Sequence, residues 1–299
     1  MRVSSAGKIR DHLWLLGTEE SCVYLLEGKE ESMLISGGMS YLVPGILRQF
    51  EEFGIDEKKI KKGLILHAHF DHVGIFPFFK RRNPEMEIIG SSRAWEILGM
   101  EKAVRTINTF SRKLTERMNS LDVYSRYDLD WDTGTKGKAV KEADTLDLGD
   151  MEVRIMETPG HSSCSISAHV PSMKALFPSD GGGIPFKKTI IPSGNSNYTS
   201  YQKNLERLKV LSVDYICADH YGYITGDEAV KYMDRSIELA EKRRSQIEDK
   251  YKRLKDIEGV VEALVSEFYR ENPDYMLPVD IAYGVNRQIV RHIAAAMDL

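Results

Sequence analysis

The stretch His67-Ala68-His69-Phe70-Asp71-His72 constrains this chain more than any other. It places three histidines and a carboxylate within six residues, directly after the apolar run Gly63-Leu64-Ile65-Leu66, which predicts a buried strand. Imidazole nitrogens and carboxylate oxygens are the donors that zinc and similar divalent metals take in proteins. We therefore expect a metal-binding loop at the end of a strand rather than a solvated polar turn.

The bulk composition is that of an ordinary globular protein. Of the 299 residues, 42% are hydrophobic and 29% charged, and the net charge is -4, so nothing global favours nucleic acid or a membrane surface as a partner. No apolar run approaches the roughly 18 residues that span a bilayer, and the N-terminus lacks the apolar core of a signal peptide. Three widely spaced cysteines argue against a disulfide framework and fit a reducing compartment. We expect a cytoplasmic protein.

Short apolar runs bounded by glycines predict strands on both sides of the metal loop, and a βαβ unit around it. The expected strands are 12–16, 22–26, 32–36, 64–66, 87–90, 151–156, 164–169, 175–177 and 214–217. Apolar residues at helical spacing predict helices at 43–53, 75–82, 199–211, 227–254, 257–269 and 278–297.

Residues 91–130 carry apolar side chains at helical spacing with few breakers, so we expect a helical insertion there. Packed core helices would show the same pattern, but an insertion beside a metal loop can also form a lid or a substrate wall. The predicted organisation is a catalytic domain at 1–226, which contains this insertion, and a C-terminal helical region at 227–299.

Further ligand-type residues follow predicted strand ends downstream of the loop. His161 comes after a Pro-Gly turn, Asp180 after the strand at 175–177, and His220 after the strand at 214–217. Five of the eight histidines therefore lie where a sheet gathers functional loops. The other three, which we expect to be structural or surface residues, are His12, His169 and His292.

In the order and placement of these residues, the chain resembles the metallo-β-lactamase-fold hydrolase superfamily over roughly residues 10–225. The resemblance implies an α/β (α+β) fold, the αββα sandwich of two mixed sheets, here with a helical insertion and a C-terminal helical appendage like that of glyoxalase-II-like and lactamase-β-2-like members. It also implies two divalent metal ions, with zinc expected and iron or manganese as alternatives. It assigns His67, His69 and His161 to one metal, Asp71, His72 and His220 to the second, and Asp180 to both.

The chain departs from the family pattern at two places. Members commonly carry an aspartate in an Asp-x-Gly turn after the third strand, where it supports the metal histidines; here Ser36 stands in that place and can still form a hydrogen bond, but brings no charge. Changes at such supporting positions can alter metal affinity 10–100-fold. The segment Ala218-Asp219-His220-Tyr221-Gly222 replaces the family's usual Pro-Gly-His-Gly turn, which brings Tyr221 or Tyr223 near the metals.

Two cations that share a water would lower its pKa and hold hydroxide for attack. The chain is therefore expected to be a metal-dependent hydrolase that uses a dimetal-bridged hydroxide, with Asp71, Asp180 and Tyr221 in catalysis. The apolar insertion favours a small acyl substrate, meaning a thioester, a lactone or a related ester. The candidate substrate-binding residues are Tyr198, Tyr223 and Lys187.

Two other activities stay open at this point. The first is a metal-dependent phosphodiesterase or ribonuclease, against which the negative net charge counts. The second is an enzyme like the mononuclear iron persulfide dioxygenases, which the complete set of seven ligands disfavours. A serine or cysteine nucleophile beside His161 is disfavoured because the metal set already uses that histidine. The expected partner is a small acyl molecule, with no membrane or nucleic acid; a homodimer stays open.

Overall fold

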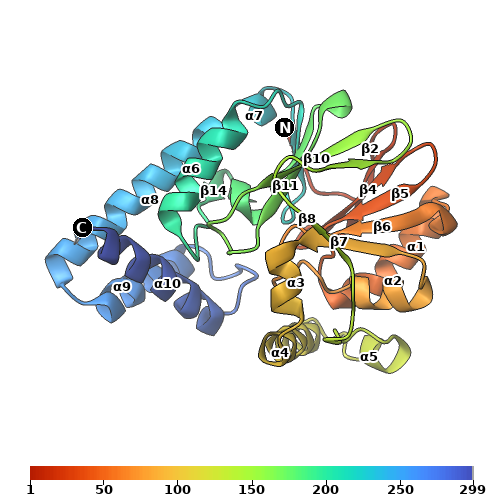
Figure 1. Ribbon diagram of the computed structural model, residues 1–299. Coiled ribbons are helices and arrows are strands. Elements are labelled where there is room, and N and C mark those ends of the chain that lie inside the picture. Colours follow the sequence, from red (N-terminus) through yellow and green to blue (C-terminus); the bar gives the residue numbers. More distant parts are fainter. Residues whose placement is uncertain (298–299) are drawn as a thin grey trace. The chain divides into compact units, whose positions relative to one another are not determined.

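The computed structural model describes residues 1–297, and its elements are labelled in Figure 1. They form two compact units. Unit 1 comprises residues 1–157, 164–179 and 212–230; unit 2 comprises 158–163, 180–211 and the chain from Lys231 onward. The division into domains at residue 226 stays a prediction.

The first sheet of unit 1 holds seven strands in the order β2-β3-β4-β5-β6-β7-β8. Strands β2 to β5 pair antiparallel, and β5 to β8 pair in parallel. The central strands are almost completely buried, which explains why they read as continuous apolar runs in the sequence. The bounds are β2 (Gly7–Arg10), β3 (Leu13–Gly17), β4 (Cys22–Glu27), β5 (Ser32–Ile35), β6 (Ile60–Leu64), β7 (Glu87–Ser91) and β8 (Lys138–Val140).

Five α-helices of unit 1 lie between strands of this sheet in chain order. They are α1 (Val43–Phe53), α2 (Phe76–Arg82), α3 (Ser92–Leu98), α4 (Glu101–Arg117) and α5 (Val123–Arg126). Helix α1 contacts β3, while α2 and α3 contact β7, on the face that points away from the second sheet (Figure 1). The helix predicted at 43–53 is confirmed, with Pro44 in its first turn and Gly54 ending it at φ 68°. The residues 91–130 contain α3, α4 and α5, as the helical spacing predicted.

The second sheet of unit 1 has the order β1-β16-β15-β12-β11-β10-β9 and is antiparallel except between β12 and β15. Its bounds are β1 (Arg2–Val3), β9 (Thr145–Asp147), β10 (Glu152–Glu157), β11 (Ile166–Val170), β12 (Ala175–Phe177), β15 (Tyr215–Cys217) and β16 (Tyr223–Thr225), after which α7 spans Asp227–Val230. Side chains of both sheets form one core, in which the Tyr24 and Phe177 rings meet edge to face at 5.4 Å. The predicted class, a mixed α/β fold of two sheets with helices, is confirmed.

The strand before the metal loop ends earlier than the sequence predicted. The apolar run suggested a strand at 64–66, but β6 ends at Leu64. At Leu66 the chain leaves the first sheet, because its carbonyl accepts a hydrogen bond of 2.8 Å from the Ile166 amide of β11, in the second sheet. The backbone directly before His67 is therefore hydrogen-bonded to both sheets, at Ile65 to β7 and at Leu66 to β11.

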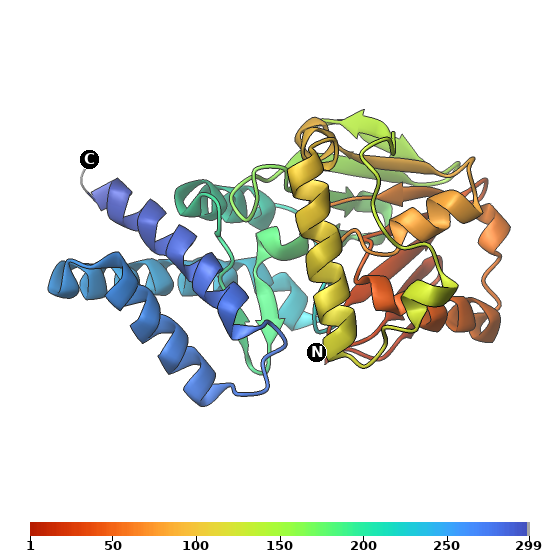
Figure 2. The ribbon, with the colours of Figure 1, turned by 90° about the horizontal axis from the view of Figure 1, so that it is seen from below.

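Unit 2 contains a small hairpin and four longer helices. Their bounds are β13 (Ile184–Phe186), β14 (Thr189–Ile191), α6 (Tyr198–Lys209), α8 (Tyr232–Leu254), α9 (Ile257–Glu271) and α10 (Val279–Met297). The last three helices follow one another along the chain and pack together through buried Val, Leu and Ile side chains (Figure 2). The helices predicted after residue 227 are confirmed, except that the first is broken at Lys231 into α7 and α8.

Four 3-10 turns complete the description, at Ser40–Leu42, Glu57–Lys59, Pro171–Met173 and Ser179–Gly182. Within residues 1–297, no helix combines the length and the apolar character that crossing a bilayer requires.

Candidate metal centre

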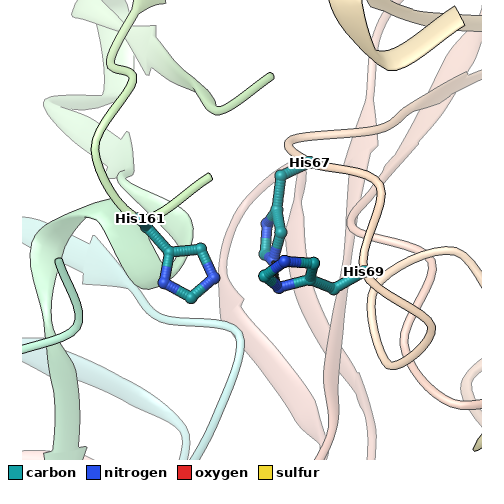
Figure 3. Close-up of side chains that lie close together, drawn as sticks. All are labelled: His67, His69 and His161. Carbon is teal, nitrogen blue, oxygen red and sulfur yellow. Dashed lines mark hydrogen bonds between the residues drawn. The ribbon is translucent and has the colours of Figure 1, made fainter. Parts of the chain in front are cut away.

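The loop after β6 brings His67 and His69 together. Figure 3 shows the two imidazole rings, whose centroids are 4.6 Å apart and whose planes are nearly perpendicular. Nε2 of His67 lies 3.1 Å from Nδ1 of His69. Two nitrogens on a tetrahedral zinc, each about 2.0–2.1 Å from the metal, would be about 3.3 Å apart. The pair therefore has the spacing of two ligands of one cation.

A second group of donors lies in the same unit and consists of Asp71, His72 and His220. The Nε2 atoms of His72 and His220 are 3.3 Å apart. Oδ2 of Asp71 lies 3.5 Å from the Nε2 of His72 and 3.7 Å from the Nε2 of His220. Both histidines are buried, and the Asp71 side chain is 13% exposed. The three distances again fit one tetrahedral face around a divalent cation.

In three of these histidines, His67, His72 and His220, the ring nitrogen Nδ1 is held by a hydrogen bond. Nδ1 of His67 donates to Ser179 Oγ at 3.0 Å, and Nδ1 of His72 donates to Asp219 Oδ2 at 2.9 Å. Nδ1 of His220 donates to the Glu20 carbonyl at 2.6 Å. These hydrogen bonds assign the Nδ1–H tautomer and leave the Nε2 lone pair for a metal, as metal-binding histidines require.

Unit 2 carries the remaining two predicted ligands next to each other. Nδ1 of His161 donates to the Ser193 carbonyl at 2.8 Å, and its Nε2 lies 3.5 Å from Asp180 Oδ2. Gly160, at φ 144°, lets this turn form, because a Cβ there would lie 2.4 Å from the backbone nitrogen of Tyr201. His161 thus has the same arrangement as His72 and His220, with one nitrogen anchored and the other beside a carboxylate.

Ser36, which the sequence suggested as a support for the metal histidines, directly follows β5. It is completely buried at φ 62°, and its hydroxyl has no hydrogen-bond partner among residues 1–297. The role of this serine as a support for the metal histidines stays a prediction. The carboxylate that contacts a metal-site histidine from behind is Asp219.

The predicted substrate residues lie in varied surroundings. Tyr221 is 7% exposed, follows His220 directly and has φ 62°, while Tyr223 lies in β16 and packs on the Tyr215 ring. In unit 2, Tyr198 is fully buried and its hydroxyl donates to the Ala240 carbonyl at 2.9 Å. This hydrogen bond links α6 to α8, so the side chain supports the packing of these two helices. Burial raises the pKa of the Tyr198 hydroxyl far above its ordinary value.

Lys187 lies at the tip of the β13–β14 hairpin and is half exposed. Its ammonium donates to Asn272 Oδ1 at 3.0 Å and lies 3.6 Å from Asp274 Oδ1. These contacts stay within unit 2, and together with the tyrosine contacts they show how much of the predicted substrate set already has partners.

Sequence reasoning missed the two residues that anchor the histidines from behind, Ser179 and Asp219. Each directly precedes a predicted ligand, Asp180 and His220 respectively. The signal that could have found Asp219 was the absence of a carboxylate at position 36 combined with an additional one beside the last ligand.

Comparisons with known proteins identify the family of the chain. Residues 17–220 match the model of the metallo-beta-lactamase superfamily. The chain is 26% identical over 171 residues, 53% of its length, to human acyl-coenzyme A thioesterase MBLAC2, and the match spans only 57% of that protein.

Solved structures share the fold. One is the metallo-beta-lactamase family protein TTHA1429 from Thermus thermophilus, with a TM-score of 0.69, 16% identity and coverage of 97% of this chain and 95% of that one. Another is ST1585 from Sulfolobus tokodaii, an archaeal metallo-beta-lactamase superfamily protein, with a TM-score of 0.58, 23% identity and coverage of 76% and 85%. Residues 17–220, which match the family model, contain all seven predicted metal ligands. The chain belongs to the metallo-β-lactamase superfamily.

Proposed function

We propose that the chain is a dinuclear metal-dependent hydrolase of acyl thioesters. The observation that carries the proposal is the group formed by Asp71, His72 and His220, whose donor atoms lie 3.3–3.7 Å apart with each histidine anchored through Nδ1. Such a face of neutral imidazoles and one carboxylate suits a divalent cation.

The family order supplies the rest of the proposed centre. His67, His69 and His161 would hold one cation, Asp71, His72 and His220 the other, and Asp180 would contact both. Cations bound there would lower the pKa of a water and polarise a carbonyl oxygen. The anchored histidines contribute by keeping Nε2 directed at the cation, because each Nδ1–H is fixed in the hydrogen bond to its anchor.

The apolar side of the proposed site comes from the metal loop and helix α4. Phe70 lies between the ligands His69 and Asp71, and its ring meets that of Phe110 edge to face at 5.6 Å. Both rings are partly exposed, and the buried Ile107 lies one turn before Phe110 on α4. An aromatic wall of this kind next to a hydrolytic centre favours a substrate with an apolar acyl chain.

The thioester class is supported by the human relative, which is described as an acyl-coenzyme A thioesterase. We extend the activity of this relative to the present chain only as a proposal, since the match covers about half of each protein. Lactones and oxygen esters share the same reacting carbonyl and are the neighbouring substrate classes.

The test is turnover of acyl-coenzyme A substrates of two to sixteen carbons by protein stripped of metal and then reloaded with zinc, manganese or iron(II). We expect hydrolysis only after reloading, and loss of activity in His72→Ala. The parallel substrates are an acyl-glutathione, a homoserine lactone and bis-p-nitrophenyl phosphate.

Distinct results would contradict the proposal. Turnover of only the phosphodiester would indicate a phosphodiesterase. About one iron per chain, together with oxygen uptake on a persulfide, would indicate a dioxygenase. Absence of metal-dependent turnover on every acyl substrate would also overturn it.

A further inference from the structure

A buried carboxylate behind the histidines, that of Asp219, lacks a lysine or arginine partner in the described part of the chain. Asp219 is 2% exposed, and no lysine or arginine among residues 1–297 forms an ion pair with it. Its Oδ1 has no hydrogen-bond partner in the same range. An uncompensated buried charge is costly, so this position needs positive charge nearby in the working protein.

The other oxygen of this carboxylate connects two histidines that the proposed centre assigns to different cations. Oδ2 of Asp219 accepts the Nδ1–H of His72 at 2.9 Å and also accepts the hydroxyl of Ser179. The Ser179 oxygen in turn accepts the Nδ1–H of His67 at 3.0 Å. Every hydrogen in this chain of bonds has one donor and one acceptor, so both rings are left with Nε2 lone pairs.

The backbone is shaped to hold these two anchors in place. Ser179 is buried and has φ 49°, a left-handed conformation that is unfavourable for a residue other than glycine. The Asp219 carbonyl accepts the Cys22 amide at 2.8 Å, and the preceding carbonyl, of Ala218, accepts the Tyr24 hydroxyl at 2.6 Å. Asp219 is therefore fixed against β4 from both sides of its own peptide.

We infer that Asp219 is a positioning residue that orients one histidine of each cation, His72 directly and His67 through Ser179. The sequence suggested Ser36 for this orienting role, but the hydroxyl of Ser36 has no hydrogen-bond partner among residues 1–297. The two cations would in turn balance its charge. This inference rests on the proposed metal centre, but not on the identity of the substrate.

Asp219→Asn and Ser179→Ala separate the two branches, because the first removes the shared charge and the second cuts only the path to His67. We expect Asp219→Asn to weaken both zinc-binding steps 10–100-fold, and Ser179→Ala to weaken only one of them. The matched control is Asp214→Asn, which makes the same change at a half-exposed acid just before β15. The readout is competition titration with a chromophoric zinc chelator, with circular dichroism to verify folding.

A second readout works without metal. Nitrogen-15 spectra of the histidine rings in metal-free wild type should show the Nδ1–H tautomer for His67 and His72, and a tautomer mixture at both in Asp219→Asn. In Ser179→Ala, only His67 should change. This arm also serves if Asp219→Asn folds poorly, since the serine variant is then compared with wild type.

The failures of the two proposals are distinguishable. Unchanged tautomers in the variants, or zinc affinities within twofold of wild type, would overturn the role of Asp219 and leave the metal centre standing. Wild type that binds no zinc, iron or manganese would overturn the metal centre, while the tautomer arm would still decide what Asp219 orients.

Discussion

At the scale of single residues, the candidate site depends on which nitrogen each histidine turns inward. His67, His72 and His220 all donate Nδ1–H to an oxygen behind them, so the Nε2 atoms face the proposed metals. The seven metal ligands are predicted from the sequence, because all are histidines or aspartates that follow predicted strands. The anchor of His220 could not be predicted, since the Glu20 carbonyl lies 200 positions away from that histidine in the sequence.

The first prediction concerns His220. His220→Ala should remove one of the two metals and lower activity by more than about 100-fold, because the Asp71–His72–His220 group loses one corner. Metal content and kcat/KM of the purified variant provide the measurement. His12→Asn is the control, as His12 is exposed at φ 69° and asparagine tolerates that conformation. Two metals retained by His220→Ala would contradict the assignment.

The second prediction concerns the three cysteines, which are all buried. Burial raises the pKa of Cys22 to about 12 and that of Cys217 well above its ordinary value. A raised pKa keeps the thiol protonated at pH 8, where an exposed cysteine is partly thiolate and reactive. Because burial also keeps the reagent from all three thiols, we expect almost no reaction with a disulfide reagent in native protein and three reactive thiols in guanidinium chloride. A native thiol that becomes reactive only after metal removal would indicate a cysteine ligand and contradict the histidine and aspartate set.

At the scale of elements, the sequence located most strands and helices but not every boundary. The run at 63–66 is apolar because Ile65 and Leu66 are buried, although the strand has already ended. Periodicity registers burial and cannot distinguish a strand from an extended segment that bridges two sheets. Two of the strands that were missed, β13 and β14, are three residues long and too short to show alternation.

The third prediction tests helix α4 as a wall for the acyl chain. Phe110→Ala should raise KM about 10-fold for long acyl chains and leave short ones almost unchanged, because only a long chain would lose the aromatic contact. Steady-state kinetics with acyl groups of increasing length provide the measurement. Lys113→Ala, at an exposed position of the same helix, is the control and should match wild type. An equal loss for all chain lengths would assign α4 a structural role only.

At the scale of the whole molecule, the predicted ligands are spread over 154 positions of the chain, from His67 to His220. The sequence predicts this set because the family's ligands recur in one order. The structure divides their neighbourhoods between unit 1, with five of them, and unit 2, with His161 and Asp180. Ligands that are distant in sequence exist as a site only in the folded chain, so metal binding is coupled to folding.

The fourth prediction follows from that coupling. Zinc at 100 times its dissociation constant should stabilise the folded chain by about 2.7 kcal/mol per site, and chelation should remove this stabilisation. For a chain of this size we expect the midpoint of thermal unfolding to fall by roughly 5–10 °C. Differential scanning calorimetry with chelator, and after zinc is restored, provides the measurement. An unchanged midpoint would show that the folded chain gains nothing from the metal.

The hydrogen bond from the Ile166 amide to the Leu66 carbonyl has a consequence for dynamics. It joins the two sheets one residue before His67, so the metal loop cannot move away from the second sheet while this bond is closed. Its amide proton therefore exchanges with solvent only when the sandwich opens at that edge. The exchange rate of this single proton reports how often the metal loop is released, and a bound metal should slow it.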